Sequence, residues 1–308
     1  MSVPARASAS AQASTRASDE AIDITPITSS QLLEGFENEI RTFSSIAGLR
    51  SAVNTLSKRL YQGTTTNQYL VLQPVTEDDL AEIEEKRHII GRGLRFTHCA
   101  DINILIIKVP TPEHEAVTRT FSYNFIDQIR PMGLTELDDL KDMGATKYRG
   151  TSTSKEPDSC WRPLAVRPNR LDWPTLIFEV GVSETLRKLR MDARWWLANS
   201  RGDVKIVLLF KVNRAARTIH IEKWECRPAA LTRATRSNLP PLQVPAQIQT
   251  IDIDANGVVT GSPPATTPPL VLHFQNLLLR PPVPPEQNVI YTAQNFQRLA
   301  NGIWAALP

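Results

Sequence analysis

The sequence predicts an α/β protein with a mixed β-sheet, and three features carry that prediction. The first is the mostly apolar run at 173–182 (WPTLIFEVGV), which is typical of a buried central strand. The second is the amphipathic helix that follows this run and continues to Asn199. The third is a pair of strand-like segments, 204–212 and 218–225, that predicts a hairpin. An α+β arrangement of the same elements stays open as the alternative.

The part of the chain before this region predicts further helices and strands. We expect one helix in SSQLLEGFENEIRTF, because this segment begins with a serine cap and its apolar residues have helical spacing. QYLVLQP predicts a strand, residues 77–86 a charged helix, and RFTHCADINILIIKVP a second, more apolar strand. Apolar residues spaced by four between Glu113 and Ile129 predict a helix that packs one face on a sheet.

Composition divides the chain into four parts. Residues 1–28 are rich in Ala and Ser and predict a disordered tail, and residues 29–110 predict a helix and strand extension. Residues 111–226 form the predicted core. Residues 227–308 contain PPL, GSPPATTPP and RPPVPP, which are typical of loops or polyproline linkers, so we expect a Pro-rich C-terminal extension packed on the core.

Cysteine content and hydropathy narrow the class of protein. Three widely spaced cysteines without a CxxC pair argue against a disulfide framework and a zinc site, and predict reduced packing residues. We therefore expect an intracellular protein, nuclear or cytoplasmic, that is not secreted. No apolar run approaches the roughly 18 residues of a membrane span, so we expect no membrane partner. The sequence also has no Gly-rich phosphate loop, so we expect no nucleotide cofactor. The oligomeric state stays open.

Charge is informative only locally. The whole chain has 35 Lys and Arg against 32 Asp and Glu, a net charge of +3 that does not argue for a nucleic-acid partner. Residues 147–225 contain 16 Lys and Arg against 9 Asp and Glu. This local excess favours a polyanionic partner such as DNA.

Two acids in the core are candidate metal ligands. Asp158 follows a proline at the start of a predicted strand, and Glu179 is the one charged residue inside the apolar strand. A carboxylate there is costly unless it is paired or bound to a metal ion. Hard cations such as Mg²⁺ prefer carboxylate oxygens from separate elements. The alternatives are a loop role for Asp158 and an arginine partner for Glu179.

The order of these motifs resembles the PD-(D/E)XK nuclease superfamily over residues 113–225. KEPDSCWRP, WPTLIFEVGVSE, RKLRMDARWWL and VKIVLL carry the resemblance. The sequence is similar to bacterial candidate restriction endonucleases, and also to a set of uncharacterised fungal proteins that share SKEPDS and WPTLIFEVGVSE. The resemblance implies a restriction-endonuclease-like mixed sheet flanked by helices, with Asp158 and Glu179 holding Mg²⁺ or Mn²⁺ for cleavage of DNA phosphodiester bonds.

The sequence departs from this superfamily at one position. The pattern places a lysine two residues after the second acid, where this chain has Gly181. Lys188 on the following helix or Lys205 on the following strand are the candidates to supply the cation that stabilises the transition state. The alternative is a catalytically inactive nuclease-fold module that binds nucleic acid or protein.

The helix of the predicted core has a row of arginines. Arg187, Arg190 and Arg194 share one helical face because they are spaced by three and four. We expect this row either to grip a nucleic-acid backbone or to form an ordinary solvated face.

Overall fold

The computed structural model describes residues 27–36, 40–229, 243–263 and 269–307. Most of the predicted disordered tail at 1–28 and the PPL segment lie outside these residues. In the described part of the chain, no helix combines the length and the apolar character that a membrane crossing requires.

The described chain forms a mixed α/β structure, as predicted, with two main sheets. The first sheet has the strand order β1–β2–β4–β3–β7–β6, and only β1 and β2 pair in parallel. Its strands are β1 (Ile40–Thr42), β2 (Tyr69–Gln73), β3 (Arg95–Cys99), β4 (Ile104–Lys108), β6 (Tyr148–Arg149) and β7 (Thr153–Lys155).

The second sheet has the order β13–β12–β11–β10–β9–β8–β5, with β9 and β10 parallel and the other pairs antiparallel. Its strands are β5 (Leu140–Asp142), β8 (Ser159–Pro163), β9 (Leu176–Gly181), β10 (Ile206–Asn213), β11 (Thr218–Pro228), β12 (Gln243–Ile253) and β13 (Val259–Ser262). A further antiparallel pair joins β14 (Leu270–Leu272) to β15 (Val289–Tyr291).

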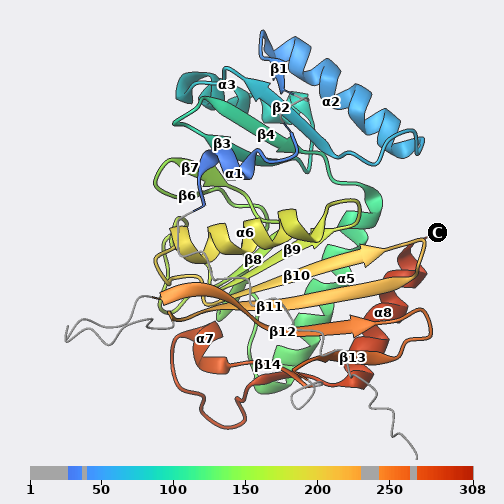
Figure 1. Cartoon of the computed structure of the whole chain (residues 1–308). Helices are drawn as coiled ribbons and strands as arrows, with labels where there is room; N and C mark the ends of the chain where they lie inside the picture. Colours follow the sequence, from blue (N-terminus) through green and yellow to red (C-terminus); the bar gives the residue numbers. More distant parts are fainter. Residues whose placement is uncertain (1–26, 37–39, 230–242, 264–268, 308) are drawn as a thin grey trace, which may run out of the picture.

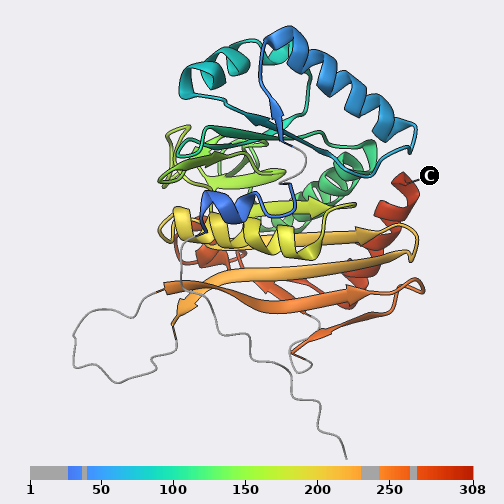
Figure 2. The ribbon, with the colours of Figure 1, turned by 45° about the horizontal axis from the view of Figure 1, so that its top comes forward.

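Helices and sheets alternate in layers (Figures 1 and 2). The helices are α1 (Ser29–Leu32), α2 (Ile46–Tyr61), α3 (Glu77–Glu85), α4 (Arg87–Ile90), α5 (Pro112–Ile129), α6 (Leu186–Asn199), α7 (Phe274–Leu278) and α8 (Ala293–Ala306). Three apolar clusters bind the layers together. One joins α2, α3 and α4 to the first sheet, one fills the space around α6 between the two sheets, and one packs α5, α7 and α8 on the second sheet.

Helix α6 lies between two sheets, and its sequence explains this position. Trp195 and Trp196 are adjacent in the chain, so their side chains point in different directions around the helix. Trp195 Nε1 donates a hydrogen bond to Thr153 in the first sheet, and Trp196 Nε1 donates one to Glu179 in the second. Both indoles are fully buried and pack edge to face with their centroids 4.8 Å apart, and each N–H finds an acceptor.

The helix–strand arrangement implied by the nuclease resemblance is present. Helix α5 precedes β5, β8 and β9, α6 links β9 to β10, and these strands are neighbours in the second sheet. The sheets nevertheless cross the predicted domain boundaries. Strands β6 and β7 complete the first sheet from within residues 111–226, and β12 continues the second sheet beyond residue 226.

Two predictions of local structure are wrong. The helix expected throughout SSQLLEGFENEIRTF ends at Leu32, because Gly35 turns the chain with a φ of 89° and β1 follows. The single strand expected from RFTHCADINILIIKVP is a hairpin of β3 and β4. Asn103 adopts a left-handed φ of 52° between them, a conformation that asparagine tolerates.

Candidate functional site

Strand pairing places Asp158 and Glu179 on adjacent strands of the second sheet. The β8–β9 ladder pairs Ser159 with Phe178, so Asp158 and Glu179 are the next opposed positions. The Val180 N–H donates to Asp158 Oδ2 over 2.8 Å, which fixes the carboxylate at the end of the strand. Both acids face α6, because side chains alternate along a strand and Ile177 belongs to the cluster around that helix.

Lys108 from the first sheet neutralises Asp158. Its Nζ lies 3.0 Å from Asp158 Oδ2 and 3.0 Å from Glu184 Oε1, and it donates to the Val180 carbonyl. His114 Nε2 lies 2.9 Å from the same Asp158 oxygen. Burial alone would raise the pKa of Asp158, but the charges of His114 and Lys108 hold that pKa well below its ordinary value. Asp158 is therefore ionised.

Lys155 is the cation that pairs with Glu179, as Lys108 pairs with Asp158. This lysine ends β7, and its Nζ lies 3.2 Å from Glu179 Oε1 and 3.3 Å from Asp192 Oδ1. Lys188 Nζ contacts the same Asp192 oxygen at 2.6 Å. Burial raises the pKa of Glu179 to about 7 against the pull of Lys155. For Asp192, burial would raise the pKa, but Lys155 and Lys188 lower it.

Glu184 is the most weakly satisfied acid of this cluster. It is 5% exposed, and neither side-chain oxygen has a hydrogen-bond donor, although Lys108 lies 3.0 Å from Oε1. Burial raises its pKa to about 8, so at neutral pH the carboxyl is largely protonated.

The acids and lysines surround a small, largely enclosed cavity. Its volume is about 20 Å³, and its lining includes Lys108, Lys155, Asp158, Glu179 and Asp192. A space of this size admits about one water molecule. It is too small for the phosphodiester group of a nucleic acid, and two of the three lysines that line it, Lys108 and Lys155, are less than 8% exposed.

The residues present do not fit a divalent metal ion as they are arranged. A bound ion needs several free carboxylate oxygens. Here Lys108 donates to both oxygens of Asp158, and His114 and the Val180 N–H approach Oδ2, while Lys155 and Trp196 approach Oε1 of Glu179. In the ranges that the structure describes, no three Asp, Glu, His or Cys side chains form a group that could hold a metal ion.

The two candidate lysines lie in different places. Lys188 lines the cavity through its contact with Asp192. Lys205 does not reach the acids, because its ammonium donates to the Gly202 carbonyl in the turn before β10.

Packing explains the glycine where the superfamily pattern has lysine. A Cβ at Gly181 would lie 2.8 Å from Leu189 Cδ1 and 3.1 Å from Glu184 Cβ. A side chain at this strand position would therefore have to displace the fully buried Leu189 of α6.

The arginine row on α6 is engaged by acids. Arg187 pairs with Glu34 at the surface, and Arg190 makes hydrogen bonds to the buried carboxylate of Glu222. Arg194 also makes an interaction within the protein. Two of the three guanidinium groups thus already have carboxylate partners, which reduces their availability to a phosphate backbone.

Sequence reasoning missed most of the groups that complete this cluster. Lys155 stands three residues before Asp158 in KEPD, and this proximity was an available signal. The sequence indicated no third acid; in the structure Asp192 of α6 joins the cluster, and α5 contributes His114. No local pattern indicates Lys108, because only the packing of one sheet against the other brings it to Asp158.

Comparisons with known proteins give little further information. No protein family matches the sequence, and no curated protein matches it significantly. A crystal structure from Anabaena variabilis ATCC 29413, described as a candidate nuclease belonging to DUF820, is similar over 67% of this chain and 90% of its own, with 9% identity and a TM-score of 0.37. A likeness at that TM-score does not by itself establish a shared fold.

Proposed function

We propose that this chain is a nuclease-like protein whose acid site is neutralised by its own lysines, and that it binds nucleic acid without cleaving it. The carrying observation is the position of Lys155, whose ammonium lies between Glu179 and Asp192, where a catalytic ion would need those oxygens. Lys108 does the same between Asp158 and Glu184. An ammonium is a point charge that offsets carboxylates but supplies no Lewis acid.

The order of α5, β8, β9, α6 and β10 supports the nuclease-like part of this proposal. The local excess of Lys and Arg supports the nucleic-acid partner. The small size of the cavity supports the absence of cleavage, because a scissile phosphate must reach the catalytic groups within hydrogen-bonding distance.

Divalent-metal-dependent cleavage of DNA is the second candidate. It is favoured by three carboxylates, Asp158, Glu179 and Asp192, that line one cavity together with Lys155 and Lys188. The raised pKa of Glu179 is also of the kind found among catalytic groups.

A plasmid assay separates the two functions. The full-length protein and Glu179→Gln are incubated with supercoiled plasmid in millimolar Mg²⁺ or Mn²⁺, and binding of labelled duplex DNA is measured in parallel. The proposal predicts that both proteins bind the duplex and that neither cleaves the plasmid. Cleavage by the wild-type protein that Glu179→Gln abolishes would overturn it in favour of the enzyme.

A further inference from the structure

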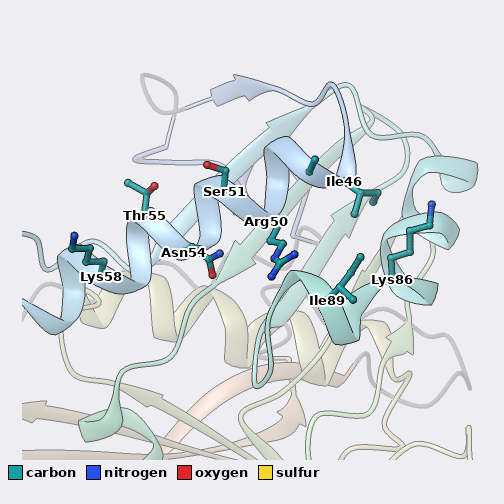
Figure 3. A pocket seen from close by; sticks show the side chains of 9 residues that line it. Ile46, Arg50, Ser51, Asn54, Thr55, Lys58, Lys86 and Ile89 are labelled. Atoms are coloured by element: carbon teal, nitrogen blue, oxygen red, sulfur yellow. The ribbon is translucent and has the colours of Figure 1, made fainter.

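A groove on the outer side of the first sheet lies far from the acid cluster in the fold. It runs between α2 and α4, has a volume of about 710 Å³, and is lined by Arg50, Asn54 and Lys58 from α2 and by Lys86 and Ile89 from the opposite side. Figure 3 shows Arg50 and Ile89 facing one another across it. No acidic residue lines this groove.

Helix α2 and the strand before it carry positive charge and no negative charge. From residue 40 to residue 76 the sequence contains Arg41, Arg50, Lys58 and Arg59 and no Asp or Glu. Within the described residues, none of these four makes an ion pair, in contrast to Arg187 and Arg190 of α6. A second groove on the other flank of α2, about 360 Å³ in volume, contains Arg41 and Arg59 and again no acid. Positive charge on this helix is therefore directed to solvent.

The remaining side chains of the exposed face of α2 favour a polyanion over a protein partner. Within the groove they are the small or neutral polar residues Ala47, Ser51, Asn54 and Thr55; the apolar side chains there are Ile46 and Ile89, and the exposed aromatic ring of α2, Tyr61, lies at its last residue. Protein interfaces use large apolar or aromatic anchors at their centre, whereas this face offers hydroxyl and amide groups that bond phosphate oxygens. Small residues also allow a nucleic-acid backbone to approach the helix closely.

The spacing of the cations suits double-stranded DNA. Arg50 and Lys58 are eight residues apart, which is about 12 Å along a helix. The major groove of B-DNA is about 12 Å wide and admits an α-helix. We propose that the exposed face of α2 binds duplex DNA, with Arg50 and Lys58 contacting phosphates on the two walls of the groove. This inference rests on the proposed nucleic-acid binding and gives it a surface distinct from the arginine row of α6.

The test measures the affinity of a labelled duplex by fluorescence anisotropy at about 50 and 200 mM salt. Arg50→Ala/Lys58→Ala is compared with wild type and with Arg119→Ala/Lys141→Ala, a control that removes the same charge from exposed positions elsewhere. Alanine is the best helix former, so the α2 variant is expected to keep its fold, which circular dichroism verifies. We expect the α2 variant to bind about tenfold more weakly and to reduce the salt slope by about 2, and the control to match wild type.

Three results would overturn the inference. Duplex binding by wild type that persists unchanged in the α2 variant refutes the surface and leaves the proposed function standing. Failure of wild type to bind any duplex refutes both. Binding of polyglutamate as tightly as duplex, with the same dependence on Arg50 and Lys58, assigns the surface to an acidic protein instead.

Discussion

Lys155 and Glu179 belong to different sheets, and their side chains meet at 3.2 Å in the layer that α6 occupies. The ammonium is buried together with the carboxylate, so neither charge is solvated by bulk water. This ion pair, with Lys108 and Asp158 beside it, joins the two sheets through buried charge. It also gives the acid inside this apolar strand a charged partner.

Lys155→Met is expected to lower the free energy of unfolding by about 3–5 kcal/mol, because it leaves Glu179 and Asp192 buried without their shared cation. Urea denaturation measures this loss. Lys205→Met is the matched control, since its ammonium reaches only the Gly202 carbonyl, and it should change stability little. Adding Glu179→Gln to Lys155→Met should recover part of the loss. A loss no larger than that of the control would contradict the buried pair.

Stability is expected to fall as pH rises from about 5 to 8. Burial raises the pKa of Glu184 from 4.5 to about 8, so across this range the folded protein holds a proton that the unfolded chain has released. Glu179, with its pKa raised to about 7, acts in the same direction. Glu184→Gln should flatten the fall and be more stable than wild type near pH 8.

Urea titrations at several pH values test the Glu184 prediction. Glu85→Gln, at an exposed position of α3, serves as the control and should keep the pH dependence of wild type. A Glu184→Gln protein with the same fall as wild type would show that this carboxyl is not the group responsible.

Phe121→Ala is expected to cost about 3–5 kcal/mol, because the ring joins α5 to the second sheet. Its centroid lies 4.5 Å from that of Phe178 and 4.4 Å from that of Phe210. Tyr123→Ala removes an aromatic ring that is 67% exposed on the same helix and should change stability by no more than about 0.5 kcal/mol. Thermal and urea unfolding compare the two, and equal losses would refute the assigned packing of α5.

Arg190→Ala is expected to reduce stability by about 1–3 kcal/mol, since it removes hydrogen bonds from the fully buried carboxylate of Glu222. Arg187→Ala breaks only a surface pair and should have an effect below about 1 kcal/mol. If the arginine row instead served DNA, the double variant would keep its stability and lose duplex affinity.

The elements that the sequence predicts best are those with strong local patterns. Strand β9 and helices α5 and α6 each lie within a few residues of their predicted bounds. Their apolar residues recur at a regular spacing in the sequence, and this spacing indicates which face of the element is buried. The β3–β4 hairpin was missed because its turn contains no glycine or proline and depends on Asn103 in a left-handed conformation.

The sequence predicts the acids of the candidate site but not the lysines that pair with them. Asp158 and Glu179 could be found from the sequence, because each lies in or next to a predicted strand, where a charged residue is unusual. Lys108 and Lys155 lie on the first sheet, and their place beside the acids depends on how two sheets and α6 pack. Tertiary packing of this kind leaves no spacing signal, so the sequence directed attention to Lys188 and Lys205 instead.

We propose that the ammonium groups of Lys108 and Lys155 occupy the positions a metal ion would need. The most direct measurement is a Mn²⁺ titration of the full-length protein and of Glu179→Ala, with free Mn²⁺ followed by electron paramagnetic resonance. We expect Mn²⁺ binding that is weak and the same for both proteins. Tighter binding by the wild-type protein that Glu179→Ala abolishes would contradict it.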